Sequence, residues 1–219
     1  MNYDRVVILL LLLILILTLW RLQPSAASEA AGQVPRRAAE SAGESEANDV
    51  LSVIHSRKSV RAYTDDPVSR EELEVLLRAG MAAPTAGNAQ PWAFVAVTER
   101  PVLDALAEVL PHGKMLKKAP AAIAVCGVES LFRDGAGREM WVQDCSAATE
   151  NILLAAEGTG LGAVWIGVYP DRNRGTGVRG VLQLPEEIIP LSVISIGRPT
   201  GVEQPKEKFK PERIHWQKW

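Results

Sequence analysis

The segment Arg57-Lys58-Ser59-Val60-Arg61 carries three cations and a hydroxyl within five residues. If the chain is extended there, Arg57, Ser59 and Arg61 lie on one face, because alternate side chains of a strand point the same way. Two guanidinium groups beside a hydroxyl match the fork geometry with which proteins hold a phosphate. Alternatively, Arg57 and Lys58 only complement the C-terminal dipole of a preceding helix, and Arg61 is solvated. The segment therefore predicts a phosphate site or a solvated helix end.

A second candidate is the segment from Ala83 to Trp92 (APTAGNAQPW), which we expect to be a loop between a helix and a strand. Its two prolines stiffen the backbone, and its small residues let a flat ligand approach closely. The side-chain amides of Asn88 and Gln90 offer donors and acceptors for an imide or carbonyl edge. The alternative is an ordinary turn in which Trp92 fills the core.

Two glycine patterns could suggest a dinucleotide-binding loop. Residues 175–180 fit GxGxxG, but Pro185 follows so soon that the helix required after this motif has no room. The glycines at 158, 160 and 162 follow a predicted helix and precede a strand, so helix capping explains them. We expect neither pattern to bind phosphate.

The cysteines and histidines do not form a metal-binding pattern. Cys126 and Cys145 are 19 residues apart, and the three histidines occur singly, so zinc-ligand spacing is absent. We expect two buried, inert thiols, and the alternative is a disulfide between them. A rival interpretation makes Cys145 a nucleophile with His112 or His215 as its base.

Taken together, RKSVR, APTAGNAQPW, Trp165 to Pro170 (WIGVYP) and a basic tail ending in IHW resemble the nitroreductase family of flavoproteins. The resemblance extends from about Asp49 to Trp219. It implies an α+β fold: a three-layer sandwich with a central mixed sheet, assembled as a homodimer with FMN at the subunit interface. It also implies an NAD(P)H-dependent oxidoreductase that passes hydride through the flavin, in a ping-pong scheme, to a nitroaromatic, a quinone or a similar small acceptor.

The resemblance also implies a role for each matched residue, and none of these residues is a catalytic acid or base. The FMN phosphate, ribityl chain and pyrimidine oxygens would be held by Arg57, Lys58, Ser59 and Arg61. The flavin ring would be approached from the second subunit by Pro84, Thr85, Ala86 and Asn88. It would be covered by Trp165, Ile166 and Gly167, with the Gly167 amide near N5. The phosphate would also be reached by Lys208 and Lys210.

The sequence departs from the family pattern in three places. Lys58 stands where a second arginine is usual, and an ammonium is a point charge rather than a fork. Gly175 and Gly177 fall where a short helix is usual, and each internal glycine costs about 1 kcal/mol, so we expect no stable helix there. A long lid between Leu110 and Ala121 is missing, which argues against a dehalogenase-type member that recognises halogenated tyrosine. Another alternative is a tethered interaction module that kept the fold but lost turnover.

The elements that must position these residues are visible in the hydrophobic pattern. Ser69 to Glu72 is a capping box before a helix that ends near Ala83. Further helices are predicted over residues 49–55, 101–110 and 141–158. Strands are predicted over residues 93–97, 121–128, 163–168 and 191–197. Three of these strands are almost continuously apolar, which is typical of a sheet covered on both faces.

Composition restricts the domain organisation and the partners. The chain has 219 residues, with 24 basic and 26 acidic side chains. The first 50 residues hold four of the basic and six of the acidic ones, so the remainder is neutral overall. This balance argues against a nucleic-acid partner. We expect one folded domain over residues 49–219, preceded by a disordered linker over residues 23–48.

The N-terminal segment contains 15 uncharged residues, from Val6 to Trp20. As a helix it would be roughly 22 Å long, shorter than the about 30 Å of a hydrocarbon core. Flanking residues could complete a span, so we predict a retained single-pass anchor within residues 1–22. The alternative is export, with signal cleavage near Ala27.

Overall fold

The computed structural model describes residues 49–219, and the predicted anchor over residues 6–20 and linker over residues 23–48 lie outside this range. The predicted N-terminal hydrophobic helix is therefore not among the described elements. Within residues 49–219, every helix is too short or too polar to cross a bilayer. One compact unit extends from Leu51 to Trp219.

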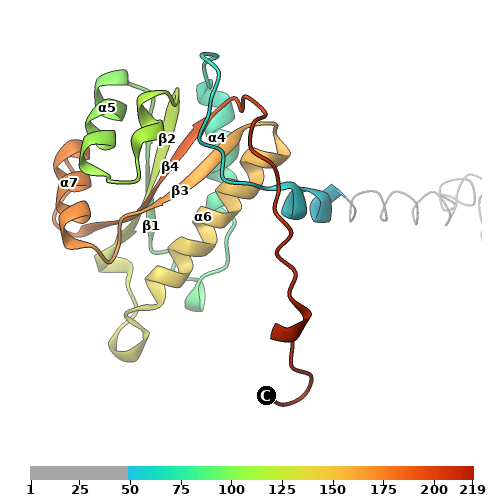
Figure 1. Ribbon diagram of the computed structural model, residues 1–219. Helices are drawn as coiled ribbons and strands as arrows, with labels where there is room; N and C mark the ends of the chain where they lie inside the picture. Colours follow the sequence, from blue (N-terminus) through green and yellow to red (C-terminus); the bar gives the residue numbers. More distant parts are fainter. Residues whose placement is uncertain (1–48) are drawn as a thin grey trace, which may run out of the picture. The chain divides into compact units, whose positions relative to one another are not determined.

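The compact unit is built from four strands and four main helices (Figure 1). The strands are β1 (Trp92–Val97), β2 (Ala121–Val128), β3 (Gly162–Gly167) and β4 (Ile188–Gly197). The helices are α4 (Arg70–Met81), α5 (Arg100–Val109), α6 (Met140–Gly158) and α7 (Arg172–Leu182), and residues 49–56 are also helical. Short 3-10 turns lie at Ala86–Asn88, Lys114–Lys117, Glu129–Leu131, Gly135–Gly137 and Pro211–Arg213.

The sheet has the strand order β1-β2-β4-β3, and each neighbouring pair is antiparallel. The predicted α+β fold with a central sheet is confirmed, but the expectation of a mixed sheet was wrong for the named strands. Parallel pairing in the described residues is limited to an isolated bridge between Ser59 and Ala163, at the free edge of β3. Continuous apolar runs indicate that both faces are covered, but not the direction in which a strand runs.

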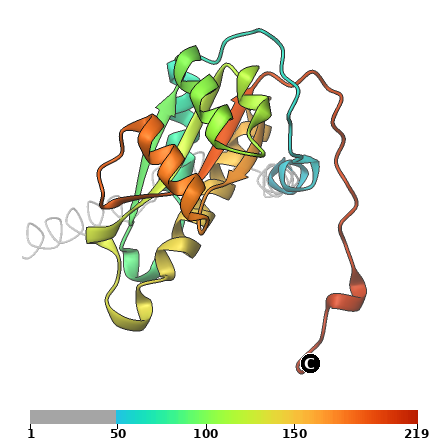
Figure 2. The same cartoon turned by 60° about the vertical axis from the view of Figure 1, so that its left-hand side comes forward.

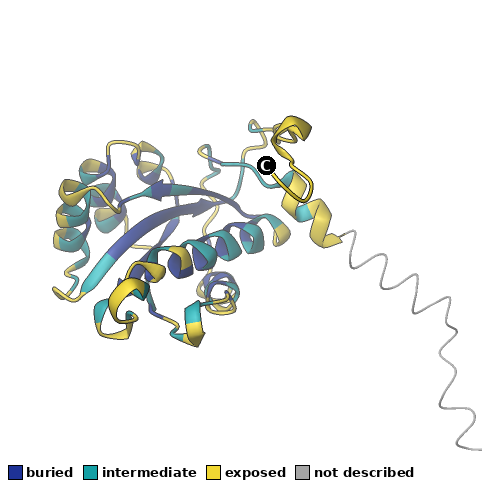
Figure 3. Cartoon of the chain, turned by 90° about the horizontal axis from the view of Figure 1, so that it is seen from below, coloured by how far each residue is buried: buried dark blue, intermediate teal, exposed yellow. Residues whose placement is uncertain are grey.

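Both faces of the sheet are covered by helices, as the two views in Figures 1 and 2 show. Along β2, Ile123 and Val125 point toward α4 and α6, whereas Ala124 and Cys126 point toward α5 and α7. This alternation follows from the two-residue repeat of a strand. Figure 3 shows the result: dark blue strands between helices whose outer surfaces are exposed. The molecule therefore has three layers and two cores.

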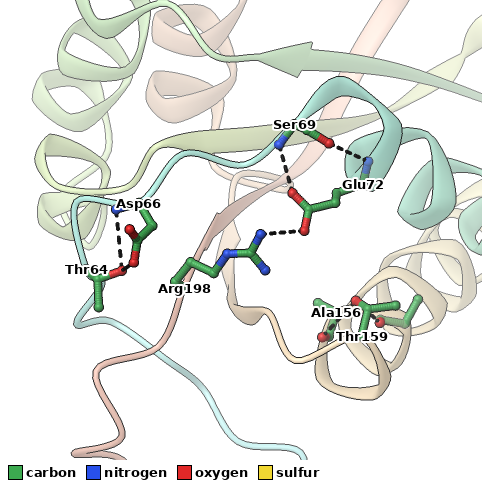
Figure 4. Close-up of polar contacts among 8 residues, drawn as sticks. Thr64, Asp66, Ser69, Glu72, Ala156, Thr159 and Arg198 are labelled. Atoms are coloured by element: carbon green, nitrogen blue, oxygen red, sulfur yellow. Dashed lines mark hydrogen bonds and ion pairs between the residues drawn. The ribbon is translucent and has the colours of Figure 1, made fainter.

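The start of α4 is fixed to the end of β4 (Figure 4). The Ser69 hydroxyl accepts from the Glu72 N–H at 3.2 Å, and the Glu72 carboxylate accepts from the Ser69 N–H at 2.9 Å. This capping box was predicted. The hydrogen bond from the Ser69 N–H lowers the pKa of Glu72, and the other carboxylate oxygen accepts from Arg198 Nη2 at 2.6 Å. The Glu72 side chain thus caps α4 and also holds Arg198, the residue just beyond β4.

Residues 172–182 form a helix, α7, although their glycines predicted none. The Asp171 carboxylate accepts from the N–H groups of Asn173 and Arg174, at 2.9 and 3.1 Å, and so caps the first turn. Val178 is fully buried on the inner side of the helix. A Cβ on Gly177 would lie 2.8 Å from Val109 Cβ, so α5 and α7 approach closely here. Packing outweighs helix propensity, and the GxGxxG pattern lies inside a helix rather than in a phosphate loop.

Candidate functional site

The segment from Arg57 to Arg61 is extended and attached to the edge of β3. The Val60 N–H donates to the Ala163 carbonyl at 3.0 Å, and the Val60 side chain is buried. A Cβ on Gly162 would lie 2.6 Å from Val60 Cγ1, so a glycine is needed for this close approach. Because Val60 points inward, the residues on either side of it, Ser59 and Arg61, are free to face a different surface.

That surface is a basic cavity of about 310 Å³. It is lined by Arg57, Lys58, Ser59, Arg61, Glu203, Gln204, Lys206 and Lys208. All four members of the predicted phosphate segment line it, together with one of the two predicted tail lysines. The other predicted lysine, Lys210, does not line it, whereas Lys206 and Glu203 do and were missed. The sequence feature that pointed to these two residues was the alternation of acidic and basic side chains between residues 203 and 208.

Two of the cavity's cations are paired with carboxylates on α6. Arg57 Nε lies 3.1 Å from Glu150 Oε1, and Lys58 Nζ lies 2.9 Å from Glu157 Oε1. These ion pairs orient the side chains of Arg57 and Lys58 across the edge of the sheet. The alternative in which the two residues only complement a helix dipole did not predict such pairs. The Arg61 guanidinium has no ion pair within residues 49–219; its Nη1 donates only to the Ser59 carbonyl, at 3.3 Å. Unlike Arg57 and Lys58, Arg61 therefore has no carboxylate partner among the described residues and is available to an anionic ligand.

A second cavity of about 440 Å³ shares Arg61 with the first. The other residues that line it are Pro111, His112, Lys114, Met115, Val164, Trp165 and Ile166. Trp165 and Ile166 were predicted to cover a flavin ring. Gly167 ends β3, and a Cβ built on it would meet no atom within 4 Å. The backbone at the end of β3 thus faces open space beside an aromatic and cationic cavity.

The loop containing Pro84, Thr85, Ala86 and Asn88 lines neither of these cavities. Its backbone is held by a buried carboxylate on α6: the Ala86 N–H donates to Asp144 Oδ1 at 2.9 Å. Gly87, Asn88 and Gln90 all have positive φ angles, between 47° and 60°, which gives the loop a tight turn. Asp144 was missed as a positioning residue. The sequence feature that could have indicated Asp144 is a carboxylate next to Cys145, within an otherwise apolar helical stripe.

The cysteines do not form a reactive site. Cys126 packs into the core beneath α5 and α7, whereas Cys145 packs into the core beneath α4 and α6. Both thiols are free, and burial raises the pKa of each to about 12. At neutral pH almost no thiolate is present, so the nucleophile interpretation of Cys145 loses its basis. Within residues 49–219, no group of three potential metal ligands is found.

Comparison with known proteins agrees with this architecture. The sequence profile described as "Nitroreductase family" matches residues 54–198. An Archaeoglobus fulgidus protein, provisionally named NADH dehydrogenase/NAD(P)H nitroreductase, is 45% identical; the alignment covers 78% of this chain and 99% of that protein.

Solved structures show the same relationship. One from Parabacteroides distasonis, with the same provisional name, is 48% identical at a TM-score of 0.73, over 78% of this chain and 98% of that one. A provisionally named Desulfovibrio desulfuricans nitroreductase, solved in complex with FMN, is 31% identical at a TM-score of 0.65, over 74% and 91% of the two chains. The chain therefore belongs to the nitroreductase family.

Proposed function

We propose that this chain is an FMN-dependent oxidoreductase that transfers hydride from NADH or NADPH to a small acceptor such as a nitroaromatic or a quinone. The observation that carries the proposal is the pair of cavities that meet at Arg61. One is basic and polar, and the other is lined by Trp165 and lies near the open end of β3. This arrangement suits a ligand with a charged tail and a flat ring.

The residues present fit FMN at both ends. Arg57, Lys58, Arg61, Lys206 and Lys208 offer charge-assisted donors to a phosphate, and Ser59 adds a hydroxyl. At the other end, the open space on the Cβ side of Gly167 lets a planar ring approach without a steric clash. A relative with 31% identity has been solved in complex with FMN, which supports the same cofactor here.

In this proposal the protein binds and orients, and we assign no side chain as an acid or base. When bound, FMN supplies a carrier that accepts hydride from one partner and donates it to the next. Arg57, Ser59 and Arg61 hold its anionic end, while Trp165 and Ile166 limit access to one face of the ring. Because donor and acceptor would use the same open face in turn, we expect ping-pong kinetics.

We further propose that two copies of the chain form the complete site. Supporting this, Phe209, Trp216 and Trp219 of the C-terminal tail are 71%, 78% and 99% exposed, and such apolar exposure is typical of an interaction surface. The loop from Pro84 to Asn88, which lines neither cavity of its own chain, would then approach the ring of the second copy.

A membrane anchor over residues 6–20 is a proposal supported by hydropathy alone. Recovery of the full chain in the membrane fraction, with its N-terminus intact, is the expected result. Recovery of a form shortened to about Ala27 would favour the exported alternative.

The proposed function is tested by the absorption spectrum of the purified domain, residues 49–219. We expect the two bands of oxidised flavin, either as purified or after FMN is added. Anaerobic bleaching by NADH or by NADPH would then identify the donor. Colourless protein that takes up no FMN would contradict the proposal and favour an interaction module without turnover.

A further inference from the structure

Glu203 joins the C-terminal tail to the segment that forms the basic cavity. Its Oε1 atom accepts two backbone hydrogen bonds, from the Arg61 N–H at 2.7 Å and from the Ala62 N–H at 3.0 Å. Its other oxygen, Oε2, is buried and has no hydrogen-bond partner in residues 49–219. Leaving a buried acceptor unpaired costs free energy, and the two hydrogen bonds that Oε1 accepts offset that cost.

Among the described residues, Glu203 also makes the last hydrogen bonds between the tail and the body of the domain. Before it, the tail is attached by hydrogen bonds from the Thr64 N–H to the Arg198 carbonyl and from the Thr200 N–H to the Ala62 carbonyl. After it, every residue from 204 to 219 is exposed, and the tail leads away from the sheet in both views (Figures 1 and 2). The direction of the tail is therefore set at Glu203.

Two of the residues just beyond this point, Lys206 and Lys208, line the basic cavity. Neither makes a hydrogen bond or an ion pair with another described residue. Long, exposed lysine side chains lose considerable entropy when they are held in place. Something must therefore keep this part of the tail beside Arg57 and Arg61, and the described contact that does so is that of Glu203.

We propose that Glu203 is a positioning residue: by binding the Arg61 and Ala62 amides, it holds Lys206 and Lys208 at the cavity, where they complete the site for a phosphate. The role for phosphate rests on the proposed FMN site. A carboxylate beside an anion site would otherwise weaken anion binding through like-charge repulsion. Glu203 is therefore expected to strengthen phosphate binding by placing the two lysines and to weaken it through its own negative charge. Substitutions of Glu203 can separate these two effects.

The experiment measures FMN affinity, by quenching of flavin fluorescence, for the full-length chain and a set of variants. E203A removes both the acceptor and the charge, whereas E203Q keeps an amide oxygen that can accept from Arg61 and Ala62. E207A is the matched control, because Glu207 carries the same charge and bonds only the nearby Phe209 N–H, at 2.7 Å. K208A and the double variant E203A/K208A complete a mutant cycle.

We expect E203A to weaken FMN binding at least tenfold, while E203Q and E207A bind as tightly as the wild type or more tightly. K208A should cost less affinity in the E203A background than alone, because the lysine is then no longer held at the cavity. The E203A affinity should also depend less on salt, since fewer cations would face the phosphate. Tighter binding by E203A, or an equal cost of K208A in both backgrounds, would overturn the proposal.

Hydrogen exchange in the FMN-free chain provides a readout that does not depend on the cofactor. E203A should accelerate exchange of the Arg61 and Ala62 amides, and E203Q should largely preserve their protection. Equal exchange in wild type and E203A would show that Glu203 does not hold the tail. If the wild type binds no FMN, the proposed function fails and the phosphate role with it, whereas the exchange data still decide whether Glu203 anchors the tail.

Discussion

Arg57 makes an ion pair and also lines the basic cavity. Its Nε atom is paired with Glu150 on α6 at 3.1 Å, while its side chain also lines the basic cavity. The ion pair leaves the two terminal nitrogens of the guanidinium to a ligand, and it fixes the direction in which they point. A side chain held in this way loses less entropy when a phosphate binds.

We therefore predict that R57A weakens FMN binding at least tenfold, which corresponds to about 1.4 kcal/mol or more. The measurement is a flavin fluorescence titration of the apoprotein. R70A is a suitable control, because Arg70 is exposed and pairs only with Glu74 on the surface of α4. Equal affinity in R57A and the wild type would remove Arg57 from the site.

Gly167 allows a test of the ring position that does not alter charge. Since a Cβ there would meet no protein atom within 4 Å, G167A should leave the melting temperature nearly unchanged. If a flavin ring lies against this backbone, the added methyl group must displace it, and we expect about tenfold weaker FMN binding. A variant that is equally stable and binds FMN with unchanged affinity would place the ring elsewhere.

At the level of elements, two of the three glycines of α7 lie in different surroundings. A Cβ on Gly175 would lie in open space, whereas one on Gly177 would lie 2.8 Å from Val109 Cβ. We predict that G175A raises the free energy of unfolding by about 0.5–1 kcal/mol through helix propensity. G177A should lower it by about 1–3 kcal/mol through overpacking. Urea denaturation of both variants provides the measurement, and a loss of stability in both would contradict this account of α7.

The same helix shows where the sequence was an incomplete guide to the elements. The other helices and the four strands were predicted within about three residues, because capping boxes and apolar runs are local signals. Helix α7 was missed because its stability comes from Asp171 and from contact with α5, which a propensity scale does not contain. Strand direction was missed for a similar reason, because it depends on where each connection returns to the sheet.

For the candidate site, local signals were enough to select the cations but not their geometry. The spacing of Arg57, Ser59 and Arg61 predicted a shared face, and all three line one cavity. The alternating charges around Glu203 and Lys206 did not indicate where these residues lie, because their position depends on a tail that folds back across about 140 residues of sequence. Whether Pro84 to Asn88 belong to the same site depends on a second copy, and that assignment stays a prediction.

At the scale of the whole molecule, the tail carries several large apolar side chains that are exposed in the single chain. Besides its aromatic residues, Val202 and Ile214 are 69% and 44% exposed. We predict that residues 49–219 sediment as a dimer at micromolar concentration, because a second copy would bury these side chains. The variant W216A/W219A should shift the equilibrium toward monomer. A wild-type domain that stays monomeric would contradict the assembly proposed for the site.

Arg61 borders both cavities, so its single guanidinium is shared between them. Occupancy of the two hollows is therefore thermodynamically linked. A free oxyanion that binds this cation in the first hollow changes the affinity of the second for its occupant, and a group bound in the second changes the affinity of the first. Such coupling is reciprocal by necessity, so buffer anions such as inorganic phosphate would alter what each half of the site can retain.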